Sequence, residues 1–173
     1  MRFTYFVFFF FFIVGISYNS NTIASPKLIS DNKVIDLQYE LIKIDGLGND
    51  EIYILEDLNG LVIINFWASW CGPCIEEIDE LNKFQERINK EKLNVRIIGI
   101  NIFDDLEEAS NFKIKYNPRF ETLFDKNKTI PIDFGVVGVP ETYFVKNNTV
   151  LFKYVGKITE EILEKGLNNI KNE

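Results

Sequence analysis

The sequence predicts an α/β fold in which a central mixed β-sheet is flanked by helices. Short apolar runs rich in β-branched residues alternate along the chain with segments in which apolar residues recur every three or four positions. The length of 173 residues is enough for one domain with a sizeable core and too short for two ordinary ones. We therefore expect a single folded domain over residues 39–173.

The first 24 residues are interpreted as a signal or membrane-anchor segment. Residues 3–18 are almost unbroken apolar sequence with only Arg2 before them, and a helix of this length would reach about 24 Å, somewhat short of a hydrocarbon layer of about 30 Å. The later stretch NTIAS is a weak cleavage pattern, so a cleaved leader and an uncleaved anchor both stay open. The position of Arg2 predicts a single-pass protein of the inner membrane whose domain faces the periplasm, or a soluble periplasmic domain if the leader is cleaved.

Residues 25–38 are polar and turn-prone, which is typical of a linker. After them, residues 39–44 and 51–55 alternate between apolar and polar side chains on either side of DGLGND, a sequence rich in turn-forming residues. This pattern predicts a β-hairpin as an N-terminal extension of the domain.

The centre of the domain follows as strand, helix, strand and helix. The runs LVIINF (residues 61–66) and VRIIGINI (residues 95–102) have the length and branching of buried strands. Between them, apolar residues at helical spacing predict an amphipathic helix that starts at the two cysteines, and Pro73 suits its first turn. Asp105 is placed to cap a second helix that extends to about Tyr116.

The C-terminal third is expected to complete the sheet. Residues 121–124 form a short strand in this interpretation, and residues 142–145 and 150–154 surround the turn sequence KNN as an antiparallel pair. A last helix over residues 159–170 has Thr159 as its cap.

Composition excludes several classes of function. The formal net charge is −7 and no Lys/Arg-rich run lies beside aromatic residues, so nucleic acid is not an expected partner. The chain has no histidine, which removes the usual general base, the usual nitrogen ligand of zinc and haem, and any Cys-His pair. We therefore expect no metal site and no cofactor.

The only two cysteines, Cys71 and Cys74, are separated by two residues. As a structural disulfide they would be a weak staple, because a four-residue loop removes about 2 kcal/mol of unfolded-state entropy and a fifteen-residue loop about 3. As a metal clip they would need a second pair of ligands, which only a second chain could supply. A redox pair agrees best with the position of the two residues after a buried strand and at the start of a helix.

In the redox interpretation the two sulfurs have different tasks. Cys71 precedes the first helical turn, where free amides and the helix dipole stabilise a thiolate, so we expect it to be the nucleophile. Cys74 lies one turn further, more buried, and would attack the mixed disulfide to leave a Cys71–Cys74 bond. Trp70 and Pro73 are expected to shape the exposed rim of the site.

The sequence FWASWCGPC resembles the thioredoxin superfamily, and the stretch DFGVVGVPET (residues 133–142) is similar to a second motif of that superfamily in the right order. The resemblance implies a thioredoxin-like fold in which Pro140 is cis and lies against the cysteine pair. It also implies that Val139 offers backbone groups to an extended substrate peptide.

The neighbours of these motifs narrow the resemblance. GVPET, together with Asn65 and Glu77, is similar to the thiol:disulfide interchange proteins of cytochrome c maturation, the DsbE or CcmG family. This implies an enzyme that reduces protein disulfides, with apocytochrome c or cytochrome c maturation proteins as partners and a membrane electron donor of the DsbD or CcdA type. A TlpA- or ResA-like reductase, a general periplasmic disulfide oxidase or isomerase, and a non-redox chaperone for apocytochrome remain alternatives.

Three polar residues are candidates for tuning the site. Asn65 is either a hydrogen-bonded core residue or, at the position where thioredoxins carry an acid, a group that slows proton transfer to or from Cys74. Glu77 is either favoured only by its place in the first helical turn, by about 0.3 to 1 kcal/mol, or is a functional acid. Glu141, beside the proline at the mouth of the site, would raise the pKa of Cys71 if close to it, and is a candidate for choosing partners.

Overall fold

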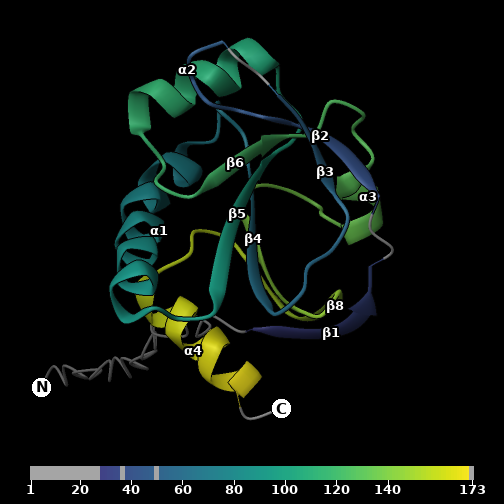
Figure 1. Cartoon of the computed structure of the whole chain (residues 1–173), viewed down its shortest axis with the longest axis vertical. Helices are drawn as coiled ribbons and strands as arrows, with labels where there is room; N and C mark the ends of the chain where they lie inside the picture. The colour runs from purple at the N-terminus through teal and green to yellow at the C-terminus, as the bar shows by residue number, and fades with distance from the viewer. Residues whose placement is uncertain (1–27, 36–37, 49–50, 172–173) are drawn as a thin grey trace, which may run out of the picture.

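In the computed structural model, residues 28–35, 38–48 and 51–171 are described. Within this part, the strands form a single sheet in the order β1-β8-β7-β4-β5-β6-β2-β3 (Figure 1). The strands are β1 Ile29–Val34, β2 Tyr39–Lys43, β3 Glu51–Leu55, β4 Leu61–Trp67, β5 Val95–Asn101, β6 Glu121–Phe124, β7 Glu141–Lys146 and β8 Thr149–Val155. The helices are α1 Gly72–Glu91, α2 Leu106–Tyr116, α3 Ile130–Phe134 and α4 Glu160–Lys171.

The predicted mixed sheet flanked by helices is confirmed. The middle strands β4, β5 and β6 are parallel, whereas β7 pairs antiparallel with β4 and β8 antiparallel with β7. Parallel neighbours require a crossover, and α1 makes this connection between β4 and β5. The register places Asn65 of β4 opposite Gly99 of β5 on one side and opposite Thr142 of β7 on the other.

Two apolar clusters cover the two faces of the sheet because successive residues of β4 point to opposite sides. Ile63 and Trp67 pack with α1, α2 and α4, and Ile64 and Phe66 pack with α3 on the other face. Figure 1 shows α1 and α3 on opposite sides of the sheet. The core strands β4 and β5 are therefore buried on both faces, as their apolar runs predict.

The structure differs from the sequence prediction at the linker. Part of residues 25–38 forms strand β1, which pairs antiparallel with β8 so that Ile29 lies opposite Lys153 and Val34 opposite Thr149. All six side chains of β1 are exposed. A strand whose side chains are all exposed has no alternation of buried and exposed residues to reveal it.

At the other edge of the sheet, β2 pairs antiparallel with both β6 and β3. Tyr39 of β2 lies opposite Leu55 of β3. The predicted turn between β2 and β3 includes residues 49–50, which lie outside the described residues. The predicted leader, residues 1–24, lies outside them as well. Among the helices that the structure describes, none combines the length and the apolar character needed to cross a membrane.

Candidate active site at the start of α1

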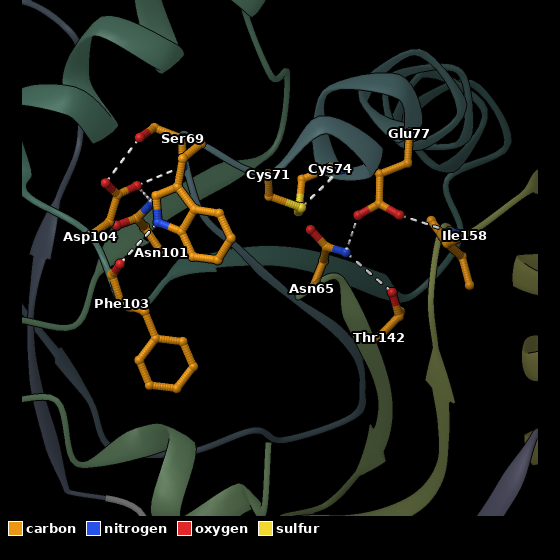
Figure 2. Close-up of a disulfide and its surroundings, with 11 residues drawn as sticks. Asn65, Ser69, Cys71, Cys74, Glu77, Asn101, Phe103, Asp104, Thr142 and Ile158 are labelled. Atoms are coloured by element: carbon orange, nitrogen blue, oxygen red, sulfur yellow. Dashed lines mark hydrogen bonds between the residues drawn. A yellow bond between two sulfur atoms is a disulfide. The ribbon is translucent and has the colours of Figure 1, made fainter. Parts of the chain in front are cut away.

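Cys71 and Cys74 are joined by a disulfide. Strand β4 ends at Trp67, a short turn follows, and Cys71 is the N-cap residue of α1 in extended backbone conformation. Pro73 lies in the first turn of the helix, where a missing N–H is tolerated. The end of a buried strand thus delivers the disulfide to the N-terminus of a long helix (Figure 2).

The sulfur of Cys71 lies where the free amides of the helix converge. The backbone N–H of Cys74 donates to Cys71 Sγ at 3.2 Å. In the reduced protein, this hydrogen bond and the helix dipole both stabilise a Cys71 thiolate. The difference in burial between the two cysteines is much smaller than expected, since Cys71 is 3% and Cys74 1% exposed. The assignment of Cys71 as nucleophile therefore depends on its helix position, with Trp70 and Pro73 exposed beside it.

The peptide bond between Val139 and Pro140 is cis. Glu141 lies opposite Phe66 in the pairing of β7 with β4, so Pro140 lies at the same end of the sheet as the turn before Cys71. Val139 is half-buried and packs against the core cluster that contains both cysteines. The motif around the proline and the CxxC motif, 66 residues apart in sequence from Cys74 to Pro140, therefore lie at the same end of the strands.

A buried polar network lies behind the disulfide. Asn65 Nδ2 donates to Glu77 Oε1 at 2.8 Å and to Thr142 Oγ1 at 3.2 Å, and the backbone N–H of Ile158 donates to Glu77 Oε2 at 2.7 Å. Asn65 Oδ1 is buried and has no hydrogen-bond partner among the described residues. Figure 2 shows this amide oxygen directed toward the disulfide. Asn65 of β4 and Glu77 of α1 thus form a buried hydrogen-bonded pair next to the disulfide (Figure 2).

Glu77 is an acid held in an apolar setting. Its side chain is fully buried, and burial raises the pKa of Glu77 from 4.5 to about 7, against the opposing effects of the Ile158 N–H, the Asn65 amide and the charge of Lys157. Helix α1 begins at Gly72, so Glu77 lies in the second turn and not in the first. The favourable effect of the helix dipole on acids in the first turn therefore does not explain it.

Glu141 follows the cis proline directly, and the structure buries its side chain. The carboxylate is fully buried and accepts hydrogen bonds from the backbone N–H groups of Val137 at 2.9 Å and Gly138 at 3.1 Å, while Tyr143 OH donates to it at 2.8 Å. Lys153 Nζ lies 3.9 Å from its second oxygen. The two amide contacts join β7 to the loop before Pro140, whereas Tyr143 lies in β7 itself and Lys153 in β8, so Glu141 helps to hold the shape of that loop.

Sequence reasoning missed a second cluster beside the disulfide. Asp104, in the loop after β5, binds the turn that carries Ser69 and Trp70, and Trp70 Nε1 donates to Phe103 O at 3.0 Å. The available signal was positional. Loops that follow neighbouring parallel strands lie at the same end of the sheet, the carboxyl end of the strands. The polar residues after Asn101 of β5 are therefore expected near the end of β4.

Comparison with known proteins agrees with this arrangement. Residues 27–159 match the model of the AhpC/TSA family. The chain belongs to this family. It is 29% identical over 131 residues to the thiol:disulfide interchange protein HelX of Rhodobacter capsulatus, a match that covers 73% of this chain and 71% of that one.

Two further relatives carry the name thiol:disulfide interchange protein DsbE. The protein of Vibrio cholerae is 34% identical over 99 residues, which cover 56% of this chain and 50% of that one. The protein of Escherichia coli K12 is 30% identical over 105 residues, which cover 60% and 54%. The matched region thus spans about half the length of these two relatives.

Solved structures show the thioredoxin-like fold. StoA from Bacillus subtilis has a TM-score of 0.60 at 16% identity, with 83% of this chain and 98% of that one covered. A secreted thiol-disulfide isomerase from Corynebacterium glutamicum has a TM-score of 0.63 at 19% identity, with 83% and 91% covered. At these identities the likeness is evidence for the fold alone.

Proposed function

We propose that this protein is a thiol:disulfide interchange enzyme that reduces protein disulfides during cytochrome c biogenesis. The observation that carries the proposal is the Cys71–Cys74 disulfide at the N-terminus of α1, with a buried acid of raised pKa behind it. The names of the relatives support disulfide exchange, and the resemblance of the GVPET motif to cytochrome c maturation proteins supports the substrate class.

The first step joins enzyme and substrate. In the reduced enzyme, the Cys71 thiolate attacks one sulfur of the substrate disulfide, a mixed disulfide forms, and the first substrate thiolate leaves and takes up a proton. The amide of Cys74 is in place to stabilise the Cys71 thiolate before attack. Val139, ahead of the cis proline, is the candidate for holding the substrate strand through its backbone.

The second step releases the product and needs a proton acceptor. The Cys74 thiol loses its proton and attacks Cys71 Sγ, which breaks the mixed disulfide, frees the second substrate thiolate and leaves the Cys71–Cys74 bond. Over both steps two electrons pass from the enzyme to the substrate, the Cys74 proton goes to its acceptor, and the two substrate thiolates take up protons from solvent. Glu77, with a pKa of about 7, is suited to accept the Cys74 proton near neutral pH. Figure 2 shows the Asn65 amide oxygen directed toward the disulfide, and this Oδ1, which has no partner among the described residues, is the candidate acceptor for a Cys74 S–H in the proposed mechanism.

The setting of the reaction is part of the same proposal. Residues 1–24 tether or export the domain, which then works in the periplasm at the inner membrane, and β2 and β3 form an N-terminal hairpin that extends the thioredoxin-like core. A membrane donor of the DsbD or CcdA type returns the disulfide to the dithiol. An enzyme that acts as a reductase in an oxidising compartment needs such a source of electrons.

The reduction potential and the substrate range test the proposal together. Purified dithiol protein is mixed with an oxidised peptide that carries a C-x-x-C-H haem-attachment sequence, and with insulin. The expected result is reduction of the peptide, little reduction of insulin, and a potential nearer to about −270 mV, as in thioredoxin, than to about −120 mV, as in DsbA. A potential close to that of DsbA would contradict a reductase and favour a disulfide oxidase.

The chaperone alternative is tested by removing both sulfurs. A double variant Cys71→Ala, Cys74→Ala cannot exchange disulfides but keeps the rest of the site. Full cytochrome assembly in cells that carry this variant would favour a binding role without redox chemistry. Loss of assembly, with the variant protein folded and present at normal levels, supports the reductase.

A further inference from the structure

The loop between β8 and α4, residues 156–159, is bonded to α1 through its backbone. The N–H of Ile158, which is fully buried, donates to Glu77 Oε2 at 2.7 Å (Figure 2). The N–H of Glu160, which begins α4, donates to Glu80 Oε2 at 3.2 Å. Glu77 and Glu80 are three positions apart on α1, so both bonds hold the loop against the same side of the helix. The place of the Ile158 amide on the Glu77 carboxylate therefore depends on how this loop is held.

The same loop is also bonded to the residue that precedes β7. The N–H of Gly156 donates to Pro140 O at 2.9 Å, and the φ of Gly156 is +106°, a conformation that favours glycine. The loop is therefore fixed at Pro140 and, two residues further along, at Glu77.

Lys157 lies between these two contacts and adds an ion pair to α1. Its Nζ lies 2.8 Å from Glu76 Oε2, and both side chains are exposed. An exposed ion pair of this kind contributes little to stability. It does fix the position of a cation directly beside Ile158, whose amide bonds to Glu77.

The surroundings of Glu77 are otherwise neutral or acidic. From the sheet it meets the uncharged amide of Asn65. The titratable side chains of α1 within three positions of Glu77, and those at the start of α4, all carry negative charge when ionised: Cys74, Glu76, Asp79, Glu80, Glu160 and Glu161. Burial raises the pKa of Glu77 to about 7, against the Ile158 N–H, the Asn65 amide and the charge of Lys157. Two of these three opposing contacts belong to the loop between β8 and α4.

We propose that Lys157 is a positioning residue for the second step of disulfide exchange, because it holds the Ile158 amide on Glu77 and favours the ionised carboxylate that accepts the Cys74 proton. This inference rests on the proposed function, in which Glu77 is that acceptor. Lys157 acts through Glu77 and is not itself a catalytic residue.

Two substitutions separate the charge of Lys157 from the ion pair that it forms. Lys157→Gln and Glu76→Gln both remove the ion pair. Lys157→Gln leaves the Glu76 carboxylate alone beside the loop, which makes ionisation of Glu77 less favourable. Glu76→Gln leaves the cation alone, which makes ionisation of Glu77 more favourable. A purely structural role of the ion pair predicts the same change in both variants.

The titration of Glu77 in the oxidised protein is the first measurement. The NMR signal of its carboxyl carbon, identified by its loss in Glu77→Gln, is followed from pH 4 to 9. The wild-type midpoint is expected near 7. The midpoint of Lys157→Gln is expected about 0.3 to 0.5 higher in pH, and that of Glu76→Gln lower by a similar amount. Because exposed charges are screened, 1 M salt should shrink both differences.

Two further variants serve as controls for the titration. Lys157→Arg keeps the charge and should restore the wild-type midpoint. Lys165→Gln removes the charge of an exposed lysine of α4 and should leave the midpoint unchanged.

The second measurement follows the reaction of the reduced protein with the small aromatic disulfide dithiobis-nitrobenzoate. The Cys71 thiolate attacks it and releases one coloured thiolate. Cys74 then passes its proton to Glu77, attacks Cys71 Sγ and releases the second coloured thiolate. At pH 6, Lys157→Gln is expected to slow the second release about two- to threefold and Glu76→Gln to accelerate it, with the first release unchanged. At pH 9 the three rates should converge, because Cys74 then ionises without an acceptor.

Opposite shifts of the Glu77 midpoint, followed by the rate of the second release, would support the role of Lys157. Shifts in the same direction in Lys157→Gln and Glu76→Gln, or no shift in either, would overturn it while the wild-type activity stands. A wild-type protein that never releases the second thiolate would instead overturn the proposed disulfide exchange, and this inference with it.

Discussion

The buried acid behind the disulfide makes a quantitative prediction about stability and pH. Glu77 has a pKa of about 7 in the folded protein against 4.5 in an unperturbed setting. This difference corresponds to about 3 kcal/mol of folding free energy, because each pKa unit is about 1.4 kcal/mol. Glu77→Gln has nearly the same shape as the protonated acid and cannot ionise, so it removes this contribution.

The sign follows from which state holds the proton. Below pH 4.5 the carboxyl is protonated in both the folded and the unfolded chain, and the two proteins respond to pH alike. Between pH 4.5 and about 7 the unfolded chain releases the proton while the folded chain keeps it, so the wild-type protein loses stability as the pH rises. Above about 7 the loss is complete.

Urea unfolding of the oxidised proteins at a series of pH values from 4 to 8.5 measures the effect. The free energy of unfolding of Glu77→Gln, minus that of the wild type, is expected to rise by about 3 kcal/mol over this range. Glu91→Gln, the same substitution at an exposed position of α1, is the matched control and should give a flat difference. A flat difference for Glu77→Gln as well would refute the raised pKa and, with it, the role of Glu77 as proton acceptor near neutral pH.

Three further substitutions test the arrangement around the site. Asn65→Asp places a second acid against Glu77 and is expected to change the rate at which the mixed disulfide resolves, measured by stopped-flow fluorescence; an unchanged rate would remove Asn65 from the proton path. Glu141→Ala leaves the amides of the loop before Pro140 without their acceptor, so the free energy of unfolding, measured with urea, is expected to fall by about 2 to 4 kcal/mol. A fall below about 1 kcal/mol would contradict the role of Glu141 in holding this loop. Gly166→Ala would place a methyl group 2.2 Å from the ring of Phe144, so a loss of about 1 to 3 kcal/mol is expected, and an unchanged melting temperature would show that the ring moves freely.

The parts of the fold that the sequence predicts well are those whose side chains are sorted by burial. The run LVIINF became β4, and the apolar spacing after the cysteines became α1, because both elements bury their apolar residues. Strand β1 escaped prediction since all of its side chains are exposed, and α3 escaped because five residues are too few to show a helical period.

In the candidate site, too, some residues could be placed from the sequence and others could not. Cys71, Cys74 and Pro140 belong to short sequence motifs, so their positions could be predicted. The roles of Glu141 and Asp104 could not, because each depends on which backbone amides a loop turns toward its carboxylate. Such contacts follow from tertiary structure and leave no periodicity in the sequence.

The network around Asn65 explains how an amide can stand where thioredoxins carry a buried acid. Asn65 is still a polar side chain in β4, and it bonds to Thr142 of β7 and to Glu77 of α1. The acidic group near the site is therefore the Glu77 carboxylate, which is the hydrogen-bond partner of Asn65. Asn65 donates to Glu77 and leaves its own oxygen free toward the disulfide. In the proposed mechanism the amide separates the charge of the Glu77 carboxylate from the sulfur, so that Glu77 would accept a proton without standing directly against a neighbouring thiolate. An arrangement of this kind would reduce the repulsion between two anions that a directly adjacent acid imposes.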